Sequence, residues 1–151
     1  MDYIVAEGVT NSDVFEARNV IRKRKTFPIS QMRTELNSFM TTIEAAGGHP
    51  SGPLVYSLNN VPYDGTMDIE FFLPLEEDYL EVEGMAFSSY FEINHVIMVS
   101  IDHDYEALTK EAYARLLWTL DQNNQELNTP FYHVLSADGI EKVTILVGYA
   151  Y

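Results

Sequence analysis

The sequence predicts an α+β protein built from two β-α-β-β units with pseudo-two-fold symmetry: an antiparallel sheet, two helices on one of its faces and a central cleft. Three observations carry this prediction. The word FEARNVI at residues 15–21 returns as FEINHVI at 91–97 in a chain of 151 residues. Apolar residues at helical spacing follow each word. Short segments rich in aromatic and branched residues then follow each helix, which is typical of strands.

The first copy predicts a strand, a helix and two further strands, near 13–24, 28–46, 53–59 and 66–74. A turn is expected at Thr26-Phe27-Pro28, because Pro28 suits the first turn of a helix. Gly47-Gly48 suit its end, since glycine commonly closes helices.

The second copy predicts the same order, with a strand, a helix and two strands near 86–101, 105–124, 130–136 and 142–151. Asp104 is expected to cap the helix. The segment GPLVYSLN at 52–59 stays in step with TPFYHVLS at 129–136, which places Tyr56 opposite His133. We therefore expect a single domain over 1–151, with one repeat at about 13–75 and the other at about 86–151, joined by the acidic stretch EEDYLEVEG.

The charge balance limits the partners. A formal net charge of −14 opposes a nucleic-acid backbone, so no nucleic-acid partner is expected. No apolar run reaches membrane-spanning length, so we expect a cytoplasmic protein without a membrane partner. Five of the nine basic residues lie in one stretch, which could face an acidic protein partner or the chain's own acidic surface: Arg18, Arg22, Lys23, Arg24 and Lys25.

Three segments carry a resemblance to a known family. They are HDYEALTKEAYARLLWTL, GPLVYSLN and DIEFFLPL, taken in their order and spacing. From about Asp13 to Tyr151 the chain resembles the GyrI-like small-molecule-binding superfamily, which includes the effector-binding domains of AraC-type and MerR-type regulators. The resemblance implies a duplicated fold whose central cleft binds hydrophobic, often cationic, small molecules. It also implies that some members are hydrolases.

One position departs from the family pattern. The family commonly places a glutamate in the cleft from the strand after the second helix, and His133 stands at that position here. A neutral imidazole does not attract a cation as a carboxylate does, and a protonated one repels it. This departure speaks against cation binding and against glutamate-dependent hydrolysis.

Aromatic side chains are the other expected lining of the cleft, because their faces stack on planar ligands. Trp118 is expected to pack under the sheet instead. The predicted ligand-binding residues are Tyr56, Phe72, Tyr90, Phe131, His133, Tyr149 and Tyr151.

Catalysis and metal binding find little support in the sequence. No nucleophile elbow, phosphate loop or HExxH helix is present. His95, His103 and His133 lack a metal-ligand spacing, so neither a metal nor a cofactor is expected.

The leading interpretation is a non-enzymatic, standalone binder of a hydrophobic small molecule. The alternatives are a protein-interaction module using Arg22, Lys23, Arg24 and Lys25, and a hydrolase with Glu70 or Glu141 in the cleft.

Overall fold

The structure of the protein is a computed structural model, which describes residues 3–60, 64–135 and 143–150. The chain separates into two compact units, each with one helix. The α1 unit is Ala17–Phe91, and the α2 unit is Met1–Glu16 together with Glu92–Tyr151. The cleft predicted between the repeats stays a prediction.

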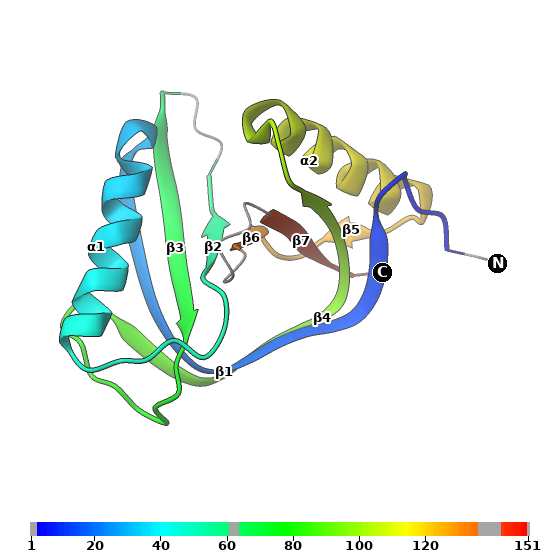
Figure 1. The fold of residues 1–151 in the computed structure, drawn as a ribbon. Helices are drawn as coiled ribbons and strands as arrows, with labels where there is room; N and C mark the ends of the chain where they lie inside the picture. Colours follow the sequence, from blue (N-terminus) through cyan, green and yellow to red (C-terminus); the bar gives the residue numbers. More distant parts are fainter. Residues whose placement is uncertain (1–2, 61–63, 136–142, 151) are drawn as a thin grey trace. The chain divides into compact units, whose positions relative to one another are not determined.

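The α1 unit is a sheet with one helix along it (Figure 1). Strand β3 pairs antiparallel with β1 on one side and with β2 on the other. The elements are β1 (Thr10–Pro28, from Ala17 on in this unit), a 3-10 turn η1 (Ile29–Gln31), α1 (Met32–Ala45), β2 (Val55–Leu58), β3 (Thr66–Pro74) and the start of β4 (Ala86–Ile101).

The core of the α1 unit follows from strand alternation. Side chains directly opposite each other in a ladder share a face, and every second residue repeats it. Phe71 of β3 stacks on Phe39 of α1, with ring centroids 5.3 Å apart, so odd-numbered residues of β3 face the helix. The register extends this face to Ile21 of β1 and Tyr56 of β2.

The α2 unit has the same order of elements. Its strand β7 pairs with both β4 and β6, because Ile145 lies opposite Val99 and opposite His133. The remaining elements are α2 (Tyr105–Gln122), β5 (Glu126–Leu127), β6 (Phe131–Leu135) and β7 (Val143–Ala150). The core joins odd-numbered strand residues to the apolar stripe of α2, namely Ile97, Val99, Ile145 and Val147 with Ala112, Leu116 and Leu120.

The repeated word coincides with an unusual backbone position in each unit. Asn19 and His95, the fifth letters of the two words, have φ angles of 56° and 57°. Left-handed backbone is rare for residues other than glycine, and Asn and His tolerate it better than most. The ladder to the last strand of each repeat begins at the next residue, with Val20 opposite Pro74 and Val96 opposite Gly148.

The predicted α+β class and the duplicated β-α-β-β order are confirmed, and some local expectations are wrong. Strand β1 continues through Thr26 and Phe27 to Pro28, because these residues pair with β3 where a turn was expected. Asp104 stands at the N-cap of α2 with φ of 46° and makes no side-chain cap bond. Trp118 is 46% exposed, since it lies on the side of α2 away from the apolar stripe.

Two further features complete the fold. The short strand β5, which the sequence did not predict, pairs with the last residues of β7. None of the described helices has the length and apolar character that a membrane crossing requires.

The left-handed position is testable at Asn19. Asn19→Ala should lower the free energy of unfolding by about 1 kcal/mol, because alanine lacks the short polar side chain whose local hydrogen bonds let asparagine adopt this backbone region. Asn19→Gly should be close to neutral, since glycine adopts it freely. Urea unfolding measures both, with Lys23→Ala in the extended part of β1 as the control. Equal losses for the alanine and glycine variants would contradict the assignment.

Candidate functional site

His133 lies on the helix-covered face of the α2 unit. Its direct partner in the β6–β7 ladder is Ile145, which is fully buried beneath α2. The imidazole therefore shares that face and meets Tyr113 from the helix. The Oη atom of Tyr113 lies 2.5 Å from Nε2 of His133, within hydrogen-bond distance, and the two rings meet edge-on at 72°.

Phe131 completes a three-ring cluster, which we call the His133 cluster: Tyr113, Phe131 and His133. The rings of Phe131 and Tyr113 stack nearly parallel, with centroids 4.0 Å apart and an angle of 8°. His133 is only 5% exposed, whereas Tyr113 and Phe131 are half-buried. The cluster thus places a partly accessible aromatic pair beside a buried polar group.

Burial decides the charge of this site. It lowers the pKa of His133 from 6.5 to about 4, because a buried imidazolium loses its hydration. At neutral pH the imidazole is therefore uncharged, with one ring nitrogen able to donate and the other able to accept. The three side chains of the cluster offer apolar surface and a polar contact, and none of the three carries the negative charge with which a carboxylate would hold a cation.

Two of the predicted ligand-binding residues pack within their own units. Tyr56 is half-buried and lies opposite Phe71 on the face that α1 covers, and desolvation raises its pKa to about 12. Tyr149 is 4% exposed, stacks on Tyr3 and donates a hydrogen bond of 3.1 Å to Asn11. Each therefore has a structural role, independent of any ligand.

Phe72 and Tyr90 lie in the α1 unit. Phe72 is on the sheet face opposite α1, where the Arg22 guanidinium lies 5.0 Å from its ring centroid and Phe91 packs at 5.0 Å. Arg18 lies 5.8 Å from the Tyr90 ring. Aromatic rings and cations therefore pair within this unit already. The last predicted residue, Tyr151, lies outside the described residues, as does Glu141.

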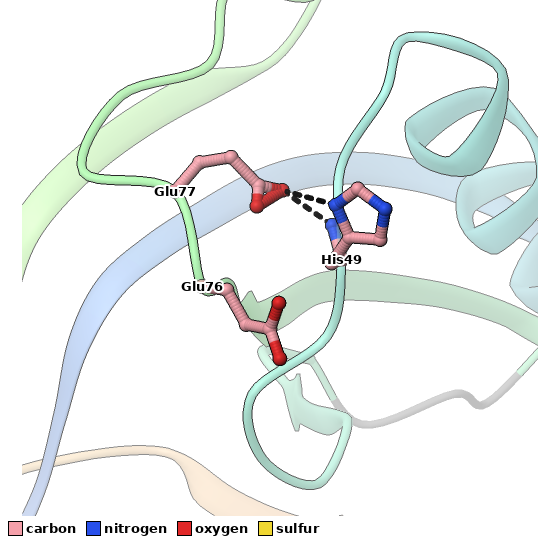
Figure 2. Close-up of side chains that lie close together, drawn as sticks. All are labelled: His49, Glu76 and Glu77. Atoms are coloured by element: carbon pink, nitrogen blue, oxygen red, sulfur yellow. Dashed lines mark hydrogen bonds and ion pairs between the residues drawn. The ribbon is translucent and has the colours of Figure 1, made fainter.

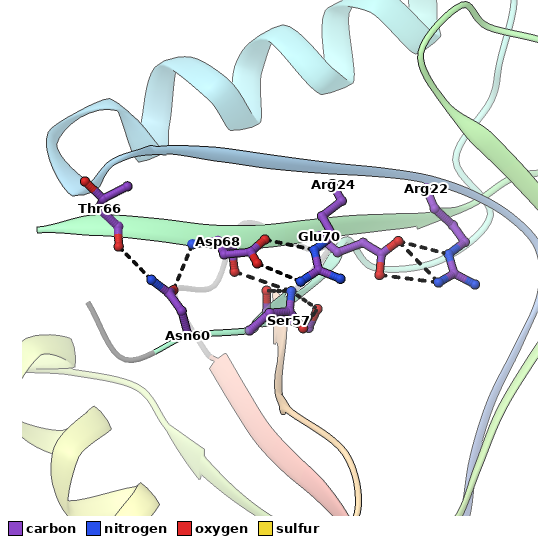
Figure 3. A network of polar contacts seen from close by, with 8 residues as sticks. Arg22, Arg24, Ser57, Asn60, Thr66, Asp68 and Glu70 are labelled. Carbon is purple, nitrogen blue, oxygen red and sulfur yellow. Dashed lines mark hydrogen bonds and ion pairs between the residues drawn. The ribbon is translucent and has the colours of Figure 1, made fainter. Parts of the chain in front are cut away.

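Strand alternation divides the predicted basic stretch between two faces. Arg22 bonds to both carboxylate oxygens of Glu70 at 3.2–3.3 Å, and Arg24 bonds to Asp68 at 2.6 and 2.9 Å (Figure 3). On the other face, Lys25 pairs with Glu35 of α1 at 3.0 Å. The hydrogen bonds from Arg24 lower the pKa of Asp68. Much of this positive charge is thus balanced by carboxylates of the same unit.

The same polar row continues toward the end of the sheet. Asn60 donates to the carbonyl of Thr66 at 2.9 Å and accepts from the backbone N–H of Asp68 at 2.8 Å (Figure 3). Ser57 is 1% exposed and bonds to Asn59. These contacts hold β2 and its following loop against β3, which is a structural function.

A cavity of about 220 Å³ lies in the α2 unit, between the end of β4 and α2. Its walls include the apolar side chains of Val99 and Leu108. Charged pairs stand around it, namely Asp102 with His103 at 2.6 Å and Glu111 with Arg115. The charged side chains around this cavity therefore already have partners.

The histidines do not gather as a metal site would require. His95 lies beside Tyr149, His103 beside Asp102 and His133 beside Tyr113. Within the described ranges, the group of three donor side chains that could hold a metal ion is His49, Glu76 and Glu77 (Figure 2). It lies in the α1 unit, where the segment after α1 meets the segment after β3.

Sequence reasoning missed Tyr113 and the His49 group. Tyr113 adjoins Ala112 of the apolar stripe, so its place at the edge of that stripe was a usable signal. For His49 the signal was weak, because its contact with Glu77 depends on the bridge between Pro50 and Leu75, far apart in the sequence.

Solved structures with this fold include proteins of several descriptions. The crystal structure of the EcmrR C-terminal domain has a TM-score of 0.71 at 15% identity, over 94% of this chain and 98% of that one. EcmrR in a cryo-EM complex with DNA has a TM-score of 0.73 at 16% identity. The match covers 95% of this chain, and this chain spans 58% of the length of the EcmrR chain. A Listeria innocua protein described as a hydrolase has a TM-score of 0.64 at 9% identity, over 98% and 94% of the two chains.

These neighbours confirm the fold that the GyrI-like resemblance implied. A comparison with the curated proteins finds no match. A protein family does match residues 17–147, which cover most of the 151-residue chain. The chain therefore belongs to the family described as "Domain of unknown function (DUF5085)".

Proposed function

We propose that the protein is a non-enzymatic binder of a hydrophobic, aromatic and uncharged small molecule, which contacts the His133 cluster. The single observation that carries the proposal is the buried, neutral His133 hydrogen-bonded to Tyr113 beside the accessible Phe131 ring. The resemblance to the GyrI-like superfamily supports the small-molecule class, since its fold is shared.

The chemistry of the cluster favours a planar ligand. Aromatic rings attract one another beyond their buried area by about 0.5–1.5 kcal/mol per pair. Phe131 and Tyr113 offer such rings at half-buried positions, and the hydrogen-bonded pair of Tyr113 and His133 gives the site a polar character that would orient the ligand. An uncharged site loses less hydration when it closes on a neutral molecule than on an ion.

A role on DNA is not part of the proposal. EcmrR has been seen in a DNA complex, but this chain matches 58% of that protein. The net charge of −14 also repels phosphates.

The two alternatives have less support. A hydrolase would need a carboxylate in the site, and Glu70 is bound by Arg22 on the sheet face opposite α1. A protein partner at the basic stretch would have to compete with the carboxylates of Asp68, Glu70 and Glu35. Turnover of an activated ester would favour the hydrolase. Salt-sensitive capture of an acidic protein would favour the interaction module, if the capture is lost when the charges of Lys23 and Lys25 are reversed.

Ligand binding is testable with a matched pair of fluorescent probes. The neutral 1-pyrenemethanol should raise the Tm by about 8 °C at a concentration 100 times its Kd, because it binds the native state. The cationic 1-pyrenemethylamine should bind more weakly, since none of the three side chains of the cluster is a carboxylate. Fluorescence titration gives both Kd values. Equal affinity for the two probes would contradict the neutral site, and absence of binding to either would contradict the proposal.

The location is testable with Phe131→Leu. Loss of one stacking ring should weaken pyrenemethanol binding by about two- to tenfold. Tyr79→Leu is the matched control, because Tyr79 is an exposed aromatic residue that pairs edge-on with Phe87 in the α1 unit. Leu108→Phe should fill part of the 220 Å³ cavity beside α2. If Leu108→Phe loses binding and Phe131→Leu keeps it in full, the ligand binds in the cavity and the location at the His133 cluster is wrong.

The charge state of His133 is testable through pH. In the unfolded chain the His133 ring is protonated near pH 6.5, and in the folded chain near pH 4. The contribution of the neutral ring to the free energy of unfolding is therefore complete above about pH 6.5 and falls as the pH is lowered from there. The loss should reach up to about 3 kcal/mol by pH 4. Urea unfolding from pH 7 to 4 should show a smaller pH-dependent loss in His133→Gln.

The exposed His103 supplies the control for this experiment. His103→Gln should keep the wild-type dependence on pH, since its side chain is 76% exposed. An NMR titration of the His133 ring gives the pKa directly. A value near 6.5 would contradict the neutral, buried imidazole.

A further inference from the structure

We infer that His49, Glu76 and Glu77 form a binding site for a divalent transition-metal ion. Each residue offers one ligand atom, and the three atoms lie within 4.8 Å of one another. The Nδ1 atom of His49 lies 3.3 Å from Oε1 of Glu77 (Figure 2). An ion with metal–ligand bonds of about 2.0–2.2 Å needs donors at about this separation. Small side-chain rotations would bring all three onto one ion.

The backbone holds these donors in place. Glu76 donates its N–H to the carbonyl of His49 at 2.8 Å, and Pro50 bridges to Leu75. The Glu77 carboxylate also accepts a hydrogen bond from the backbone N–H of His49. The two segments are therefore joined at the metal donors themselves, which lowers the entropy cost of bringing them together.

The end of α1 fixes the position of His49. Gly48 donates to the carbonyl of Ile43 at 3.0 Å and is buried. A β-carbon there would lie 2.6 Å from Ile43 Cγ2 and 2.9 Å from Leu80 Cδ2, closer than such atoms pack. Glycine thus lets the chain turn tightly, so that the next residue faces the acidic segment after β3.

The charge and the donor type select the ion. Residues 76–84 carry five carboxylates and no basic residue, which favours a cation. An imidazole with two carboxylates suits Zn²⁺, Mn²⁺ or Co²⁺ better than Mg²⁺, which prefers oxygen ligands alone. His49 is 71% exposed on its side chain, so an ion has access from solvent and would keep water ligands. The imidazole distinguishes this site from an ordinary acidic surface.

The test is metal binding by the tag-free chain. Calorimetric titration with Zn²⁺ should give one site per chain, with much weaker binding of Mg²⁺. His49→Ala and Glu77→Gln should each weaken Zn²⁺ binding at least about tenfold, since each removes a ligand. Glutamine keeps an oxygen that can accept the His49 N–H, so the backbone contact survives in that variant.

His103→Ala is the matched control, because His103 is also exposed and also lies beside a carboxylate, Asp102. It should leave Zn²⁺ affinity unchanged. Substoichiometric Mn²⁺ should selectively broaden the NMR signals of the His49 ring in the wild-type chain. Equal Zn²⁺ affinity in wild type and His49→Ala, or broadening at His103 without broadening at His49, would overturn the site. Binding of pyrenemethanol in the presence of EDTA tests the His133 cluster separately.

Discussion

Within each unit one helix covers one face of the sheet, and this constraint decides which strand side chains are packed against a helix. Because strand residues alternate between faces, the parity of a residue number decides whether its side chain meets a helix. In the α2 unit the burial of Ile145 under α2 places its ladder partner His133 on the same face. The imidazole is then held uncharged by its surroundings, and its chemistry follows from the packing of apolar neighbours.

The face of the α1 sheet opposite α1 carries ion pairs that help to fix the strand register. Arg22 lies opposite Phe72 but bonds to Glu70, and Arg24 lies opposite Glu70 but bonds to Asp68. Both pairs are therefore displaced by the same two residues along β3. Exposed ion pairs contribute little stability, about 0–1 kcal/mol each. Their value here is that a shift of β1 against β3 would break both together, so they support a single register.

The elements of the fold were predictable because apolar spacing is a local property, and the helices and strands of both copies follow it. Long-range pairing decided the rest. Thr26 and Phe27 form strand because β3 lies alongside, which local turn chemistry does not reveal. His133 and Phe131 could be singled out from the repeat, whereas the partnership with Tyr113 depends on how α2 crosses the strands. The approach of His49 to Glu77 likewise depends on pairing between segments distant in sequence.

The left-handed residues Asn19 and His95 bear on how the two copies can diverge. A position with this backbone rejects β-branched residues and accepts a short set that includes Gly, Asn, Asp and His. Divergence after a duplication is therefore confined there to a small set of residue types, and histidine is the member that brings an imidazole ring. The second copy carries that member. The two copies therefore keep the same left-handed backbone at this position, while the side chain is an amide in the first copy and an imidazole in the second.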